Sequence, residues 1–142
     1  MNSTLDLSSL VQAAGDAIIA AGTDGKIRLW NPAAERMFGF TAEEALGHAL
    51  DLIIPERWRT RHWEGYRRVM RTGQSHYGTE VLRVPALHKN GHTLSIAFTV
   101  ALLHAEDGGI QAIAAIVRDE TARWEEERAL RRRLTELEAR SR

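Results

Sequence analysis

The histidine in the most suggestive setting is His62, which lies in a segment predicted to be one long helix. Pro55 precedes this segment and Gly73 follows it, which favours a helix over residues 56–72. Aromatic and apolar side chains recur there at helical spacing and share one face with the histidine: Trp58, His62, Tyr66 and Val69. The imidazole is therefore predicted to face the interior of the protein.

Charged residues occupy the opposite face of this predicted helix, and we expect that face to be solvated. They are Arg57, Arg61, Glu64, Arg68 and Arg71. His62 and Glu64 do not form a catalytic dyad, because residues two apart on a helix point in different directions. Other histidines stand near turns or strand ends without metal-ligand spacing and are expected at the surface: His48, His88, His92 and His104.

Several kinds of chemistry are excluded by what the sequence lacks. There is no cysteine, so disulfides, thiolate metal sites, a cysteine nucleophile and a cysteinyl-flavin adduct are ruled out. There is no glycine-rich phosphate loop, no G-x-S-x-G, no H-E-x-x-H and no kinase or cyclase motif. We therefore expect a chain that is not an enzyme, with any catalytic output domain lying outside it.

Composition favours a single globular domain. The chain has 142 residues, of which 44% are hydrophobic and 27% are charged. Nineteen basic residues balance 19 acidic ones, so no net charge attracts nucleic acid or an anionic membrane. The N-terminus does not resemble a signal peptide, and no apolar run approaches the length of a membrane span. A cytoplasmic protein without nucleic-acid or membrane partners is expected.

The first half of the chain predicts short helices around a hairpin. Residues 7–14 favour a helix capped by Asp6, and strands over 17–21 and 26–30 flank a turn at Asp24 and Gly25. Asn31 and Pro32 suit the start of a helix over 33–38. Thr41 and Glu44 form a capping-box pattern for a second short helix ending at Gly47.

After Gly73 the apolar period changes from helical to alternating. A strand is predicted over 76–87, followed by a hairpin turn at 89–91 and a strand in which alternate residues are apolar: Leu94, Ile96, Phe98, Val100 and Leu102. A last strand is predicted over 110–118. Together these elements predict an α+β domain with an antiparallel sheet and helices against one face.

The C-terminal segment from Thr121 is highly charged and lacks Gly and Pro, which favours a helix. Leu130, Leu134 and Leu137 follow one another at four and three residues, the spacing of a two-helix seam. Because an isolated helix of this kind is marginal in water, we expect it to lie against a second copy of the chain.

Three segments in this order resemble the PAS superfamily. The first is Asn31-Pro32-Ala33-Ala34-Glu35-Arg36-Met37-Phe38-Gly39-Phe40, with Glu44 and Gly47 following it. The second is the hairpin Lys89-Asn90-Gly91. The third is Arg118-Asp119-Glu120-Thr121, which is similar to the D-x-T element between the last strand and a signalling helix. The resemblance covers about residues 7–121 and the helix beyond.

This resemblance implies a PAS fold with a five-stranded antiparallel sheet in the order 2-1-5-4-3, a ligand cavity between sheet and helices, and a coiled-coil-like C-terminal helix. It implies an N-terminal helical cap over 1–15, the sensory domain over 16–120 and a signalling and dimerisation helix over 121–142. It further implies a homodimer through the flanking helices and no intrinsic catalysis. Asp119 and Thr121 either relay the state of the sheet to that helix or simply cap it.

Residues 59–66 resemble the corresponding helix of the heme-binding PAS domains of bacterial oxygen-sensor kinases. The resemblance implies that His62 ligates the iron of heme b, that Tyr66 lies at the site, and that Arg68 and His76 contact the heme propionates. Neutral imidazole is a good iron ligand, and cations offset propionate charge. The alternative is that His62 packs on the helix and hydrogen-bonds to backbone.

The family's distal arginine, which binds oxygen, falls at Leu82 in an ungapped count, and Arg83 is its neighbour. If Leu82 faces the iron, oxygen loses its hydrogen-bond donor and carbon monoxide or nitric oxide is favoured. If a one-residue bulge turns Arg83 inward, oxygen sensing survives. The sequence leaves both arrangements open.

Other occupants of the cavity also stay open: non-covalent flavin, a small carboxylate, a lipid, or none, in which case the domain serves dimerisation and signal relay. Trp30, Trp58 and Trp63 either stack on a planar ligand or belong to the core and rim. In the family, the C-terminal helix leads into a histidine kinase of a two-component system, a cyclic-dinucleotide enzyme or a transcription regulator. The sequence does not choose among these outputs.

Overall fold

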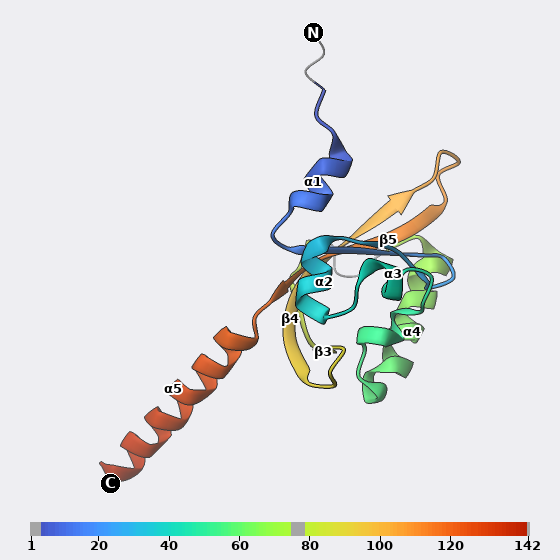
Figure 1. Cartoon of the computed structure of the whole chain (residues 1–142). Coiled ribbons are helices and arrows are strands. Elements are labelled where there is room, and N and C mark those ends of the chain that lie inside the picture. Colours follow the sequence, from blue (N-terminus) through green and yellow to red (C-terminus); the bar gives the residue numbers. More distant parts are fainter. Residues whose placement is uncertain (1–3, 75–78, 142) are drawn as a thin grey trace.

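The sheet is the framework of the molecule. A computed structural model describes residues 4–74 and 79–141 and shows one antiparallel five-stranded sheet in the order β2-β1-β5-β4-β3 (Figure 1). Its strands are β1 (Ala17–Gly22), β2 (Ile27–Trp30), β3 (Leu82–Leu87), β4 (Thr93–His104) and β5 (Ile110–Asp119). The predicted fold class and strand order are confirmed.

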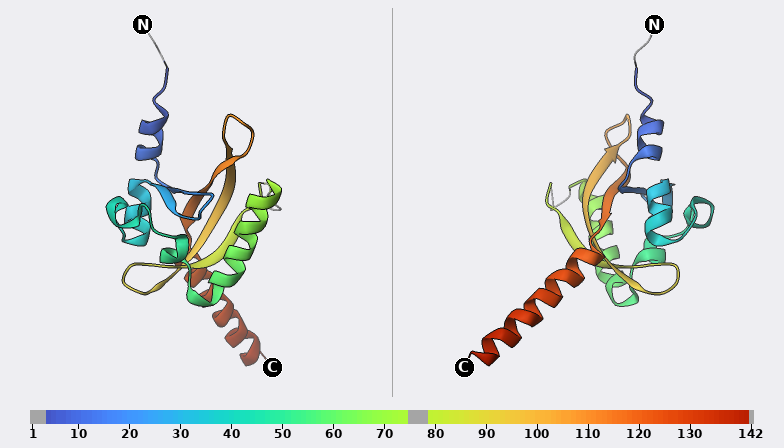
Figure 2. Two further views of the ribbon diagram at one scale, coloured as in Figure 1. Left: turned by 90° about the vertical axis from the view of Figure 1, so that its right-hand side faces the viewer. Right: turned by 60° about the vertical axis from the view of Figure 1, so that its left-hand side comes forward.

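The helices fall into a group that packs on the sheet and two that extend from it. The elements are α1 (Leu7–Ala13), α2 (Pro32–Phe38), α3 (Ala42–Ala45), the 3₁₀ helix η1 (Leu50–Ile53), α4 (Glu56–Thr72) and α5 (Thr121–Arg140). Figure 2 shows α1 and α5 leading away from the body of the domain, whereas α2, α3 and α4 lie against it. The apolar face that holds Ile19, Ile96 and Val117 meets this packed group.

Side-chain caps begin the short helices where the sequence predicted them. Asp6 caps α1, Asn31 caps α2, and Thr41 with Glu44 forms the capping box of α3. These residues satisfy amide groups that the first helical turn leaves without partners. The caps fix the start of each helix, which is why sequence reasoning located them well.

Two predicted boundaries are wrong. Helix α3 ends at Ala45 and not at Gly47, because the Gly47 N–H donates to the Ile27 carbonyl (2.8 Å), and the chain there lies beside β2. Strand β3 begins at Leu82, opposite Phe98, and not at residue 76; residues 79–81 have no pairing partner on β4. Residues 75–78 lie outside the described part of the chain.

Asn31 is a fully buried polar residue that joins three elements. Its Oδ1 accepts from the Ile18 N–H (2.9 Å) in β1 and the Ala34 N–H (3.0 Å) in α2. Its Nδ2 donates to the carbonyls of Val11 (2.9 Å) and Asp16 (3.1 Å). Every polar atom of the side chain is thus used, so burial carries no unpaired polar group.

Helix α5 leaves the sheet with no buried residue, and its leucines are open to solvent. Leu130, Leu134 and Leu137 are 64%, 57% and 54% exposed. In the described part of the chain, no helix combines the length and the apolarity needed to cross a bilayer.

Candidate ligand-binding site

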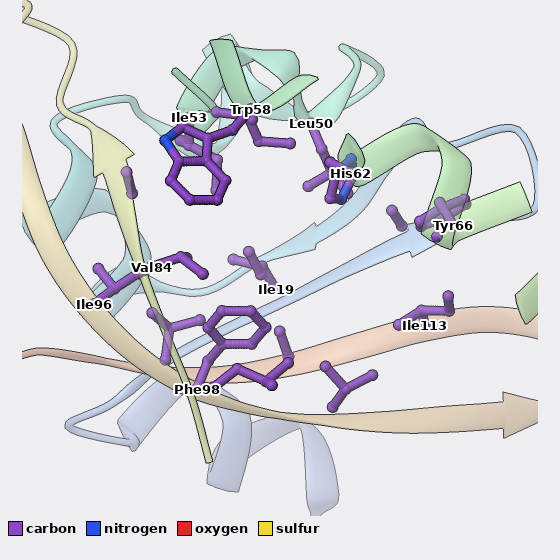
Figure 3. A pocket seen from close by; sticks show the side chains of 18 of the residues that line it. Ile19, Leu50, Ile53, Trp58, His62, Tyr66, Val84, Ile96, Phe98 and Ile113 are labelled. Carbon is purple, nitrogen blue, oxygen red and sulfur yellow. The ribbon is translucent and has the colours of Figure 1, made fainter. Parts of the chain in front are cut away.

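A cavity of about 430 Å³ lies between α4 and the sheet (Figure 3). This volume is within the range of about 300–1,000 Å³ that is typical of small-molecule sites. Its sheet wall is hydrocarbon and includes Ile19, Val84, Ile96, Phe98 and Ile113. Figure 3 shows these side chains facing Trp58, His62 and Tyr66 across the space.

The predicted stripe of α4 forms the other wall of this cavity. Trp58, His62, Tyr66 and Val69 all line it, as their spacing predicts. The charged residues of the opposite face are exposed, and two of them, Arg61 and Arg68, also border the cavity. The amphipathic pattern of α4 therefore brings Trp58, His62 and Tyr66 to the cavity and leaves the predicted charged face exposed.

His62 carries a buried ring nitrogen without a partner. Its Nδ1 is shielded from solvent and has no hydrogen bond within the described residues. Burial lowers the pKa of the imidazole, and the charge of Asp51 opposes this effect. The ring contacts Trp63 edge-on, with centroids 4.7 Å apart. A neutral imidazole with a free nitrogen beside a cavity is suited to bind a ligand or a metal centre.

The indole nitrogen of Trp58, on the same helix, is a second buried polar atom without a hydrogen-bond partner in the described chain. Its Nε1–H is buried and donates to no group in residues 4–74 and 79–141. The guanidinium groups of Arg57 and Arg61 lie over its ring, at 5.7 and 5.4 Å from the centroid. Buried polar groups are normally paired, so two nitrogens without a partner in the described chain, one helical turn apart, set α4 apart from the other packed helices.

Trp30 and Trp63 are structural. Trp30 is buried against Phe38 and donates from Nε1 to the Phe40 carbonyl (2.9 Å). Trp63 donates from Nε1 to the Asp51 carboxylate (2.6 Å), which ties α4 to η1. Stacking on a planar ligand in the cavity is thus left to Trp58 alone among these three.

Tyr66 contributes its ring to the cavity and its hydroxyl to the fold. The O–H donates to the Gly22 carbonyl at the end of β1, and both residues are buried. Burial, with a smaller contribution from the charge of Asp24, raises the pKa of Tyr66 to about 12. The hydroxyl is therefore held by the protein and is not free to bind a ligand.

Strand β3 presents Leu82 to the cavity. Leu82 pairs with Phe98 and Val84 with Ile96, in a ladder that runs to Leu87 with no bulge. Because side chains alternate along a strand, Leu82 shares the cavity face with Phe98 and Val84. Its neighbour Arg83 is 63% exposed, and its Nε lies 3.5 Å from the Glu120 carboxylate. The sequence could not choose between these two residues, and the register places Leu82 inward.

The family follows from comparison with known proteins. The family model described as PAS fold matches residues 11–125, most of the chain. The chain belongs to the PAS family. The predicted resemblance is thereby confirmed, and the cavity between α4 and the sheet is the cavity of a PAS domain.

The relatives of this PAS domain include sensor proteins. It is 29% identical over 133 residues to the sensor protein FixL of Bradyrhizobium diazoefficiens, covering 94% of this chain and 25% of FixL. It is 30% identical over 108 residues to the oxygen sensor protein DosP of Escherichia coli, covering 74% of this chain and 13% of DosP. The chain therefore spans a quarter or less of these relatives, and it is a sensory module that matches only part of each.

A solved structure supports the same fold. The PAS domain of a protein from Colwellia psychrerythraea superimposes with a TM-score of 0.71 at 21% identity, covering 82% of this chain and 95% of that one. Identity at this level establishes the fold and leaves the ligand open.

The junction between the sheet and α5 is held by side chains of the D-x-T element. Asp119 Oδ1 accepts from the N–H (2.9 Å) and Oγ1 (2.5 Å) of Thr121, and Thr121 Oγ1 accepts from the Ser95 N–H (2.9 Å) in β4. Sequence reasoning missed Glu120, whose carboxylate lies within ion-pair distance of both Arg83 in β3 and Arg123 in α5. No local pattern signals this pair, because Arg83 is distant in sequence.

Proposed function

We propose that this PAS domain is the ligand-sensing input module of a signal-transduction protein and that its ligand is heme b, bound through His62. The observation that carries the proposal is that His62 lines an apolar cavity and that its buried Nδ1 has no hydrogen-bond partner among the described residues. The similarity to the oxygen sensor protein DosP supports it. A signal of this kind is a diatomic gas or a change of redox state.

The residues present fit the chemistry of heme. His62 would supply the imidazole that heme iron binds. The porphyrin needs an apolar slot, and the sheet wall with Leu50 and Ile53 provides it. The propionates need cations near the edge of the cavity, where Arg68 lies exposed. His76, the other residue proposed to contact them, lies outside the described residues.

When bound, heme supplies an iron that takes up a small gas molecule reversibly. The roles of the chain follow from the geometry of its own residues. His62 offers its nitrogen; Trp58 covers one end of the same wall; Tyr66 packs its ring against His62, with centroids 5.8 Å apart, while its hydroxyl holds α4 to β1. A shift of α4 therefore reaches the sheet through Gly22.

A second candidate is a PAS domain that binds another small ligand, or none, and acts in dimerisation and signal relay. The Nε1–H of Trp58 has no partner among the described residues, which favours such a ligand over an empty cavity, because an N–H suits a hydrogen-bond acceptor such as a carboxylate. This candidate and heme make opposite predictions for the absorption spectrum of the protein.

We further propose that Asp119 and Thr121 pass the state of the sheet to α5. Thr121 is the first residue of α5, and its Oγ1 accepts from the Ser95 N–H in β4, so a change in β4 reorients the start of the helix. Glu120 adds a second connection between β3 and α5. The output partner is proposed to be a histidine kinase, a cyclic-dinucleotide enzyme or a transcription regulator joined to α5, in a cytoplasmic protein.

The proposed homodimer uses the exposed leucines of α5. Changing Leu130, Leu134 and Leu137 to Gln is expected to give a monomer by light scattering, since burial of this row is what favours association. The matched control changes residues on another face of the same helix: Arg128, Arg132 and Thr135 to Gln. A triple leucine variant that remains a dimer excludes α5 as the seam.

The decisive experiment for heme is a visible absorption spectrum, taken before and after hemin is added and then reduced, for wild type and His62→Ala. A sharp Soret band that His62→Ala loses or shifts is expected. A spectrum without a band, or a band that ignores the substitution, contradicts the heme proposal. Mass spectrometry of the native protein would then identify any other small molecule retained in the cavity.

A further inference from the structure

The two walls of the cavity differ sharply in polarity. Among the lining residues of α4 are His62, Trp58, Arg61 and Arg68, whose side chains carry polar groups. The strands contribute hydrocarbon: Ile19, Leu82, Val84, Ile96, Phe98, Val100, Leu102, Ile113 and Ala115. Arg83 also borders the cavity, but its charged group is at Glu120. Within the described residues, the sheet wall thus offers no free hydrogen-bond donor.

We infer that the sheet wall selects a gas that stays nearly neutral when bound, carbon monoxide or nitric oxide, over dioxygen; this rests on the proposed heme function. A group held by His62 would meet Leu82 and Phe98 on the sheet wall that lies across the cavity from this residue. The donors of α4 share the wall of His62, so they lie on the wrong side to reach a molecule held there.

The selectivity follows from charge. Dioxygen takes electron density from ferrous iron and becomes partly negative, so a nearby donor stabilises it, whereas carbon monoxide remains close to neutral. A hydrogen bond to a charged group contributes about 1.5–3 kcal/mol, which corresponds to roughly 10- to 150-fold in affinity. A hydrocarbon wall withholds this gain from dioxygen and costs carbon monoxide little.

The backbone register makes Leu82 the specificity-determining residue. The β3–β4 ladder from Leu82 to Leu87 has no bulge, so a slip that would exchange Leu82 for Arg83 has to break its pairing with Phe98. The ion pair of Arg83 with Glu120 opposes the same slip from the other face. Strand β3 thereby holds the guanidinium group of Arg83 at Glu120, although Arg83 borders the cavity.

The test compares the oxygen and carbon monoxide affinities of the reduced, hemin-loaded protein by their visible spectra. Leu82→Arg is expected to raise the ratio of oxygen to carbon monoxide affinity about tenfold or more. The control Arg83→Leu removes the neighbouring cation and is expected to leave the ratio unchanged. If Arg83→Leu lowers oxygen affinity about tenfold, Arg83 acts inside the cavity and the inference is overturned.

A measurement on wild type serves if Leu82→Arg fails to fold. The infrared stretch of bound carbon monoxide is recorded in H₂O and D₂O. No isotope shift is expected, since no exchangeable donor faces the gas; a clear shift overturns the inference while leaving heme binding intact. Failure of wild type to bind hemin at all overturns the proposed function, and the inference with it.

Discussion

Helices α2 and α4 lie against the same sheet but differ in how completely they pack and in whether their buried polar atoms are hydrogen-bonded. At α2, Asn31 is fully buried and all its polar atoms are bonded, while Ala33, Ala34 and Phe38 fill the space above the sheet. At α4, a cavity remains, and the ring nitrogens of Trp58 and His62 have no partners in the described chain. The first region is fully packed and hydrogen-bonded, whereas the second has the cavity that we propose holds a ligand.

The largest expected effect is on stability, at Asn31 in the region of α2. Asn31→Ala removes bonds to β1, α2 and the segment after α1, and leaves buried backbone groups unpaired. We expect the free energy of unfolding to fall by about 3 kcal/mol or more, measured by urea denaturation. The control Asn90→Ala removes an exposed turn contact to the His92 N–H and should cost about 1 kcal/mol at most. Equal losses in the two variants would show that α2 is not the more tightly built region.

Tyr66→Phe tests the bond that ties α4 to β1. The variant keeps the ring and removes one of the two donors to the buried Gly22 carbonyl, which still accepts from the Gly25 N–H, so a loss of about 0.5–1.5 kcal/mol is expected in the same assay. Because the folded pKa of Tyr66 is about 12 and its reference value is 10.0, its stabilisation should be lost as pH rises from 10 towards 12. Wild type and Tyr66→Phe should therefore converge in that range, and a constant difference would contradict the assignment.

His62→Leu tests whether the α4 wall is adapted to a ligand and not to stability. It replaces a buried polar ring that lacks a partner with a hydrocarbon side chain. The ligand-free protein should become more stable by about 1 kcal/mol and should lose hemin binding. His88→Leu, which removes a histidine that bonds the Asn90 N–H on the hairpin, is the control and should not gain stability. A destabilised His62→Leu would indicate that His62 is a packing residue.

The smallest expected effect is the pH dependence of stability that comes from His62. Because burial lowers the folded pKa of His62 below its reference value of 6.5, the unfolded chain binds a proton before the folded one does. Above pH 6.5 the ionisation of His62 does not affect the free energy of unfolding. As pH drops through 6.5 towards the lower folded pKa, proton uptake by the unfolded chain lowers that free energy. Melting temperatures between pH 7.5 and 5 should therefore fall more for wild type than for His62→Leu. Parallel curves would contradict the lowered pKa.

The sequence predicted which side chains of α4 line the site, because these side chains recur at a regular spacing along one helix. Helical spacing placed Trp58, His62 and Tyr66 on one face, and that face lines the cavity. It could not decide between Leu82 and Arg83, because a one-residue slip exchanges the faces of a strand and only the pairing with β4 fixes the register.

The contacts that sequence reasoning missed are all long-range. Bonds from Asn31 to Val11 and Asp16, from Tyr66 to Gly22 and between Glu120 and Arg83 depend on the assembled sheet. The absence of a partner for the Trp58 nitrogen is likewise a property of the packed structure and leaves no pattern in the chain.

Hydrogen–deuterium exchange with and without hemin tests the contrast between the two regions most directly, with His62→Leu measured in parallel. Our account predicts slower exchange in α4, β3 and β4 of the hemin-loaded wild type, little change in α2, and no effect of hemin on His62→Leu. Slower exchange centred on α2, or the same protection in His62→Leu, would contradict the claim that the α4 wall is the ligand-binding region.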